Sequence, residues 1–399
     1  MNLVFISPNF PTYYWNFCKS LRERGVTVLG VGDAPYDDLV NETKESLVEY
    51  YRVNNLQNYD EVYRAMGFFI GKYGRIDYIE SQNEFWLELE AQLREDFNIH
   101  HGLRPKKLEV MKFKSKMKDV YKKANVPTAR YKVFKDDQEL LDFCKEVGFP
   151  IVVKPDNGVG ASHTYRLSGE QELKNFLSEK ETDVSYIMEE FIYAEINSYD
   201  AIIDSHGESL FETGNITPIS IMDIVNNEDN AIFYILKDLP EDTRKAGRAT
   251  VKSFGVKSRF VHFEFFRLTK DQEGLGKKGS IVALEVNMRP CGGFTPDMMN
   301  FAHSLDVYKI WADMIAFDKT EVRSKGHAYC AFAGRRDGKH FVYDDAQIRE
   351  KYRFNLKMDQ RLPKALAEAM GDQMYVALFK TKKEMDKFYH DILKCKASV

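Results

Sequence analysis

The chain has 399 residues, of which 44% are apolar and 30% charged, and its formal net charge is −4. This composition is typical of a folded globular protein, and it excludes wholesale disorder and a general electrostatic attraction for nucleic acid or anionic membranes. The longest apolar runs, residues 231–236 and 374–379, are far shorter than the ~20 residues of a membrane-spanning helix. The first residues do not resemble a signal peptide. The five cysteines are scattered without a C-x-x-C pair, so we expect a cytoplasmic protein with reduced thiols, no disulfide framework and no zinc site.

The first hundred residues alternate between strand and helix patterns. Strands are predicted at 3–7, 26–31 and 76–81, and helices at 12–24, 60–72 and 83–96. This alternation predicts a small doubly wound parallel sheet. The first strand-to-helix turn has no glycine fingerprint, which argues against a dinucleotide site there.

The remainder predicts a mixed α+β core followed by a small α/β segment. A lysine-rich helix at 106–125 precedes Val-Pro-Thr, and a capped helix follows at 136–148. Further elements are strands at 150–154, 186–191, 259–268 and 280–288, a hairpin of 198–204 with 208–215, helices at 241–254 and 296–317, and tail strands at 327–333 and 374–380 before a final helix. We expect four segments: residues 1–104, 105–190, 191–320 and 321–399.

The strand at 281–289 separates its side chains into two faces by alternation. One face is apolar: Val282, Leu284, Val286 and Met288. The other presents a carboxylate, an amide and a guanidinium: Glu285, Asn287 and Arg289. Such a row suits a site for hard cations and phosphate oxygens. The alternative is an ordinary charged outer face of a half-exposed strand.

The aromatic strand at 259–268 carries Glu264 in its middle, and a lone carboxylate there is costly unless it is paired. If residues 269–279 form a hairpin loop, Glu264 lies opposite Glu285, where the two charges would repel each other unless a cation lies between them. Mg²⁺ suits such oxygen ligands. The alternative is a salt bridge from Glu264 to Arg259 or Arg267.

Two further segments carry weaker signals. Lys154 ends a buried strand and is followed by a loop with Gly158 and Gly160, which offers a charge and free backbone N–H groups to phosphates without being a Walker A loop. In the strand that follows, backbone groups at 189–192 could pair with an adenine edge and Glu195 with ribose hydroxyls. Without context, these are edge-strand acids.

In chain order, these elements resemble the ATP-grasp superfamily, over roughly residues 105–320. The resemblance rests on a lysine helix ending in V-P-T, then P-I-V-V-K-P with a glycine loop, then M-E-E-F-I-x-x-E, F-E-F and E-V-N-M-R-P. It implies an ATP-grasp fold with an N-terminal Rossmann-like α/β domain, and ATP held between two α+β subdomains beneath a mobile loop at 157–162. Glu190 departs from the pattern, since many members have lysine there, and Cys291 stands where small polar residues are commoner.

The resemblance also implies the roles of individual residues. One or two Mg²⁺ ions, or Mn²⁺, would bind Glu264, Glu285 and Asn287. The nucleotide would contact Lys114, Lys154, Gly158, Gly160, Ser162, Glu189, Glu190, Phe191, Ile192 and Glu195. Lys112 and Lys116 remain alternatives to Lys114. Arg289, Lys154 and Asn287 would act in catalysis, with Arg289 facing the substrate carboxylate or the acyl-phosphate.

The implied activity is a ligase that joins a small-molecule carboxylate to an amine through an acyl-phosphate. We expect both substrates to be amino acids. The alternatives are a kinase on the same fold and a purine-pathway or carboxylase-type enzyme. We expect no nucleic-acid or membrane partner, and a homodimer is compatible with this class. Three residues remain open as substrate contacts: Cys291, His262 and Glu84. The simpler interpretations are a pocket-wall thiol, a packed histidine and a first-turn helix acid.

Overall fold

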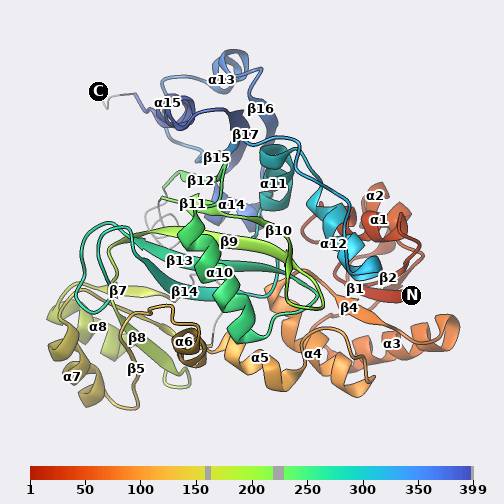
Figure 1. Ribbon diagram of the computed structural model, residues 1–399, viewed down its shortest axis with the longest axis horizontal. Coiled ribbons are helices and arrows are strands. Elements are labelled where there is room, and N and C mark those ends of the chain that lie inside the picture. Colours follow the sequence, from red (N-terminus) through yellow and green to blue (C-terminus); the bar gives the residue numbers. More distant parts are fainter. Residues whose placement is uncertain (158–162, 219–228, 397–399) are drawn as a thin grey trace.

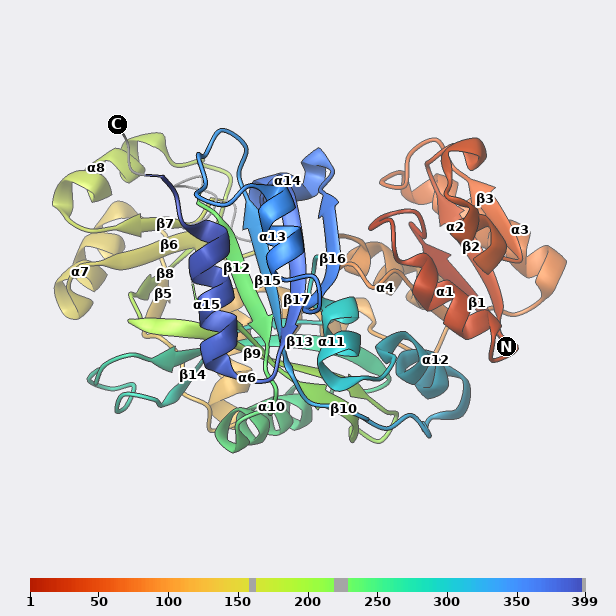
Figure 2. The same cartoon turned by 90° about the horizontal axis from the view of Figure 1, so that it is seen from above.

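The structure, a computed structural model, describes residues 1–157, 163–218 and 229–396. Within these residues the strands form three sheets (Figure 1). The N-terminal α/β piece and a small antiparallel sheet lie at opposite ends of a large antiparallel sheet (Figure 2). No helix in the described ranges combines the length and apolar character needed to cross a bilayer.

The N-terminal sheet is parallel, as the sequence predicts. Its order is β3-β2-β1-β4, with β1 Asn2–Ile6, β2 Thr27–Gly32, β3 Glu49–Arg52 and β4 Tyr78–Glu80. The helices are α1 Trp15–Arg22, α2 Asn41–Ser46, α3 Tyr59–Tyr73 and α4 Leu87–Asp96. The sequence analysis missed β3, a short edge strand without a fully buried residue.

The small sheet has the order β5-β8-β6-β7 and is antiparallel. Its strands are β5 Tyr131–Val133, β6 Ile151–Pro155, β7 Tyr165–Leu167 and β8 Tyr186–Glu190. Helices α7 Asp137–Val147 and α8 Glu170–Glu179 share one apolar cluster with these strands. Asp136 caps α7 by accepting a hydrogen bond from the backbone N–H of Glu139, as predicted.

In the described part of the chain, the large sheet has nine strands, and the C-terminal segment contributes three of them: β15, β16 and β17. The strands are β9 Ala194–Ile203, β10 Ser209–Thr213, β11 Asn215–Thr217, β12 Ala231–Ile235, β13 Arg259–Leu268, β14 Ile281–Asn287, β15 Tyr329–Arg335, β16 Leu356–Arg361 and β17 Gln373–Phe379. The predicted β9–β10 hairpin is confirmed. Helix α10 Glu241–Phe254, whose bounds match the prediction, packs on the face of β9 and β14 (Figure 1). The tail helices are α13 Asp345–Lys351, α14 Lys364–Met370 and α15 Lys382–Leu393.

Two helices predicted as continuous are broken, so these predictions were wrong. Residues 106–125 form α5 Pro105–Lys112 and α6 Lys114–Lys123, because Phe113 is extended and the N–H of Lys114 donates to the carbonyl of Asp156. Residues 296–317 form α11 Thr295–His303 and α12 Val307–Phe317. There Ser304 adopts a left-handed conformation with φ 49°, and Asp306 caps the second helix.

A bulge in β14 corrects the predicted alternation of its faces. Glu264 pairs with Glu285 but Phe265 pairs with Ala283, so Leu284 is the extra residue. The residues before Leu284 therefore lie on the faces opposite to those that simple alternation predicts. Ala283 packs with Val286 and Met288 beneath α10, whereas Val282 lies in the cluster on the other face with Ile192.

Candidate active site

Six residues form two rows across the adjacent strands β9, β13 and β14, on the sheet face opposite α10. In the first row Asp200 pairs with His262, which pairs with Asn287; in the second, Ser198 pairs with Glu264, which pairs with Glu285. Successive rows are two residues apart, so their side chains share one face. The predicted hairpin is therefore confirmed, and the three predicted oxygen ligands of a cation, Glu264, Glu285 and Asn287, lie on one surface.

The donor set at this surface fits Mg²⁺. Glu264 and Glu285 are carboxylates in direct cross-strand register and Asn287 is an amide in the neighbouring row. Like charges in that position destabilise a sheet unless a cation offsets them. The alternative partners of Glu264, Arg259 and Arg267, pair elsewhere, with Glu80 and Asp242.

Lysines from two elements converge on Glu189 of β8. Its carboxylate oxygens lie 2.6 Å from Lys118 Nζ and 2.8 Å from Lys154 Nζ, and all three residues are buried. Burial raises the pKa of the Glu189 carboxyl, but the two ammonium groups outweigh it and lower the pKa to about 2. Burial lowers the pKa of Lys118. For Lys154 the same burial is outweighed by Glu189, and its pKa rises. The sequence analysis did not single out Lys118.

The break between α5 and α6 decides how the lysines at 112, 114 and 116 are directed. Lys114 Nζ lies 3.5 Å from Glu285 Oε1, with the Lys114 side chain nearly buried. Lys112 pairs with Glu88 and Lys116 with Glu109. Only Lys114 of the three is directed at the carboxylate rows in the described structure, which supports the predicted choice.

The predicted nucleotide segment at 189–192 borders an apolar cluster. Ile192 is buried with Ala129 and Val282, and Phe191 carries the guanidinium of Arg166 over its ring at 4.3 Å. Glu190 has its own partner, because its carboxylate accepts two hydrogen bonds from the Arg130 guanidinium and one from the Arg130 backbone N–H. Glu195 is exposed. Gly158, Gly160 and Ser162 lie outside the described residues.

Arg289 connects the rows to the N-terminal piece. Its Nε lies 3.2 Å from Oε2 of Glu84, in the short helix Glu84–Trp86 that follows β4. Burial raises the pKa of the Glu84 carboxyl, against the opposing effect of Arg289. Burial lowers the pKa of Arg289, but Glu84 and neighbouring groups outweigh it and raise the pKa. Glu84 is therefore at the site, in contact with the guanidinium.

Cys291, for which the sequence left a pocket-wall thiol as the simpler interpretation, lies next to a histidine and an acid. Donor atoms of Asp200, His262 and Cys291 all lie within 4.8 Å of one another. His262 Nδ1 is 2.8 Å from Asp200 Oδ1, and His262 Nε2 is 3.3 Å from Glu264 Oε1. Burial lowers the pKa of His262, but Cys291 and Asp200 outweigh it and hold the pKa well above its ordinary value. Asp200 was missed, because no local pattern links it to His262, 62 residues away.

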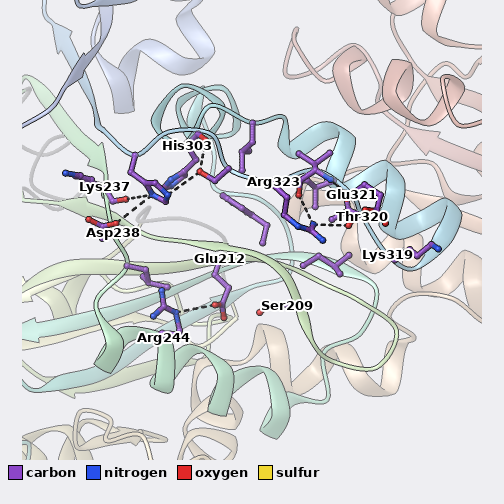
Figure 3. A pocket seen from close by; sticks show the side chains of 18 residues that line it. Ser209, Glu212, Lys237, Asp238, Arg244, His303, Lys319, Thr320, Glu321 and Arg323 are labelled. Atoms are coloured by element: carbon purple, nitrogen blue, oxygen red, sulfur yellow. Dashed lines mark hydrogen bonds and ion pairs between the residues drawn. The ribbon is translucent and has the colours of Figure 1, made fainter.

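A separate cavity of about 690 Å³ lies beside β10 and the 319–327 connection (Figure 3). Glu212, Arg244, His303 and Arg323 are among its lining residues. None of the predicted site residues lines it. The convergence of Lys154, Glu264, Glu285 and Arg289 therefore identifies the candidate active site better than cavity size does.

The chain is similar to known proteins in sequence and in fold. Residues 113–198 match the family of the carbamoyl-phosphate synthase L chain, ATP binding domain. A phosphoribosylamine–glycine ligase of Clostridium acetobutylicum is 41% identical over 69 residues, which is 16% of this chain and 16% of that relative. The chain thus matches only about a sixth of the length of that curated relative.

Solved structures are similar over nearly the whole chain. An L-amino acid ligase from Bacillus licheniformis has a TM-score of 0.70 at 16% identity, covering 98% of this chain and 96% of that one. A phosphoribosylglycinamide synthetase from Anaerococcus prevotii has a TM-score of 0.65 at 15% identity, covering 99% and 98%. The biotin carboxylase domain of a Hydrogenobacter thermophilus 2-oxoglutarate carboxylase, solved with MgADP and bicarbonate, has a TM-score of 0.68 at 16% identity, covering 99% and 90%. The chain therefore has the ATP-grasp fold.

Proposed function

We propose that the protein is an ATP-dependent ligase that joins a carboxylate to an amine through an acyl-phosphate and releases ADP and phosphate. The observation that carries the proposal is the convergence of Glu264, Glu285 and Asn287 with Lys114, Lys154 and Arg289. The likeness to an amino acid ligase and to a phosphoribosylglycinamide synthetase supports the same class of reaction.

The reaction needs no covalent attachment to the protein. A carboxylate oxygen of the substrate attacks the γ-phosphorus of ATP, and ADP leaves. The amine nitrogen then attacks the acyl carbon, the bond from that carbon to the phosphate oxygen breaks, and the amine loses a proton as the amide forms. Phosphoryl transfer of this kind depends on alignment and on neutralising charge.

The residues that this chain supplies divide by charge. Lys154 and Lys114 are the ammonium groups that would contact the phosphates, and each already lies at a carboxylate of the site. Arg289 would face the substrate carboxylate and then the acyl-phosphate. Glu264, Glu285 and Asn287 would hold Mg²⁺, which when bound supplies neutralisation of phosphate charge.

The adenine would lie at the apolar cluster around Ile192. Ala129, Val282 and Leu268 provide its apolar surface. The N–H groups of Glu190 and Phe191 already donate to the carbonyls of Arg130 and Pro150, so the adenine edge would bond to other backbone groups of 189–192. Glu84 is a candidate contact for an amino group of the substrate, since it is buried next to Arg289 and carries a carboxylate.

The test is to measure ADP and phosphate from Mg·ATP against a panel of amino acids, offered singly and in pairs, with bicarbonate as an additional acceptor. The ligase reaction requires both products to depend on two substrates together, and the active pair identifies the reaction. ADP without free phosphate in the presence of one acceptor would establish a kinase instead. Turnover that depends on bicarbonate would establish a carboxylase-type activity, as in the relative solved with bicarbonate.

A further inference from the structure

We infer that Asp200, His262 and Cys291 form a second cation site, for an ion of the zinc class, beside the predicted Mg²⁺ site. The three donor atoms lie within 4.8 Å of one another. Asp200 and His262 are buried, and Cys291 is partly exposed at the start of the segment after β14. The three residues share no spacing motif, which is why no zinc site was expected from the sequence.

The donor set selects the kind of ion. A thiolate, an imidazole and a carboxylate are the ligands of Zn²⁺ and similar ions, whereas Mg²⁺ prefers oxygen ligands alone. The neighbouring set of Glu264, Glu285 and Asn287 contains only oxygen donors in its predicted role. The two sets therefore differ in chemistry although they occupy adjacent rows of the same sheet.

The surroundings of Asp200 support a ligand role. Its Oδ2 accepts a hydrogen bond from the Ser198 hydroxyl, and that hydroxyl in turn accepts from the backbone N–H of Asn215 at 2.8 Å. Its Oδ1 is directed at His262 Nδ1, 2.8 Å away. One carboxylate oxygen is thus held in place while the other is directed into the cluster, as in metal sites whose ligands are oriented by outer hydrogen bonds.

The local charge and chain geometry also favour a bound cation. Glu264 lies 3.3 Å from His262 Nε2, and Glu285 lies opposite Glu264, so the cluster has further negative charge beside it.

Ligand atoms of a tetrahedral Zn²⁺ lie about 3.3–3.8 Å apart, given bonds of about 2.0–2.3 Å. A donor pair at the 4.8 Å limit must therefore close by about 1.0–1.5 Å, and the Asp200–His262 pair, now 2.8 Å apart, must open by about 0.5 Å. Gly292 and Gly293 directly follow Cys291, and Gly293 already has φ 62°, so the segment can make this adjustment. On binding, the ion replaces the Asp200–His262 hydrogen bond, and the thiol releases its proton to solvent.

The test uses the full chain, stripped of metals with a chelator and then dialysed against Zn²⁺ with Mg²⁺ in excess to occupy the oxygen site. We expect one Zn²⁺ per chain, and with Co²⁺ a thiolate-to-cobalt charge-transfer absorption. Cys291→Ser should abolish that absorption and weaken Zn²⁺ binding by about tenfold or more. The matched control is Cys395→Ser, since Cys395 is an exposed thiol outside the cluster. No bound Zn²⁺ in the wild-type chain, or an unchanged absorption in Cys291→Ser, would overturn the inference.

A second measurement needs no variant and no turnover. Zn²⁺ should slow alkylation of Cys291 and leave alkylation of Cys395 unchanged, as followed by peptide mass spectrometry. Equal rates for Cys291 with and without Zn²⁺ would also overturn the inference. Both readouts are independent of catalysis. A failure of the zinc inference is therefore distinguishable from a failure of the proposed ligase activity.

Discussion

Glu264 and Glu285 are cross-strand partners in β13 and β14, and their carboxylates share the sheet face that also presents Asn287. Lys114 Nζ is 3.5 Å from Glu285, and His262 Nε2 is 3.3 Å from Glu264. Each carboxylate therefore has a cationic or hydrogen-bonding neighbour, and the pair supplies oxygen donors of the kind that a divalent ion prefers.

Replacing Glu285 by Gln should lower Mg²⁺-dependent ATP turnover by about 10²–10³-fold, because one charged ligand of the ion is lost. The fold should persist, since Glu285 is partly exposed and the amide has the same shape. Turnover is measured as ADP release over a Mg²⁺ titration, with thermal melting as the check on folding. Glu273→Gln, in the exposed hairpin loop, is the matched control. Wild-type turnover in Glu285→Gln would contradict the metal assignment.

Replacing Lys154 by Met should weaken nucleotide binding by about ten- to a hundredfold, because a buried ammonium next to the phosphate-binding region is removed. Glu189 keeps Lys118 at 2.6 Å, so its carboxylate stays paired and the chain should fold. Affinity is measured by calorimetry with an ATP analogue. Lys145→Met is the control, because Lys145 is 73% exposed on α7 of the same subdomain. Equal affinities for the two variants would remove Lys154 from the nucleotide site.

A buried ionic network joins the N-terminal piece to β13. The Arg259 guanidinium lies 3.0 Å from Glu80 and donates to the Met288 carbonyl at 2.8 Å, and Arg94 binds Glu80 and Glu90. Arg259→Met should lower the free energy of unfolding by about 3–5 kcal/mol, since it leaves Arg94 alone to compensate two buried carboxylates, Glu80 and Glu90, within this network.

The comparison variant is Arg248→Met. Arg248 binds Glu212 through two hydrogen bonds, but its side chain is 60% exposed, so its loss should cost about 0–1 kcal/mol. Urea unfolding of both variants measures the difference. Similar losses of unfolding free energy in the two variants would show that the buried Arg259 contacts stabilise the chain no more than an exposed ion pair does.

His303 should make stability depend on pH. Burial and then the neighbouring His327 lower the His303 pKa to about 4 from its ordinary value of 6.5. Between these values the unfolded chain binds more protons, so the contribution of the neutral histidine is complete above pH 6.5 and is lost as pH falls towards 4. The loss amounts to about 3 kcal/mol. His303→Gln should therefore reduce the fall in unfolding free energy over this window, measured by urea unfolding, whereas exposed His100→Gln should not. An unchanged slope in His303→Gln would contradict the buried neutral state.

Local pattern predicted much of the fold. The bounds of α10 and β13 follow directly from helix and strand periodicity, and the pairing of Glu264 with Glu285 follows from two strands joined by a short loop. Each of these features depends on residues close in sequence, so one sequence carries the information. The ordered lysine, glycine and carboxylate motifs indicated the ATP-grasp superfamily for the same reason.

Tertiary contacts decided the rest. The chain breaks at Phe113 because the backbone there bonds to the segment after β6, and Val282 changes face because of a bulge within the β13–β14 pairing. The first departure arises where a contact with a distant segment overrides a local period, and the second where strand pairing takes in an extra residue that periodicity does not record.

The site itself shows the same division. The sequence by itself determined that Glu285 and Asn287 share a strand face and that Glu264 lies opposite Glu285, because strand alternation and a short connecting loop set both features. Only the tertiary structure placed Asp200 beside His262, Cys291 within reach of both, and Glu84 against Arg289. The physical reason is that strand register and domain contacts between residues far apart in sequence are set by burial of the whole core, which no local spacing records.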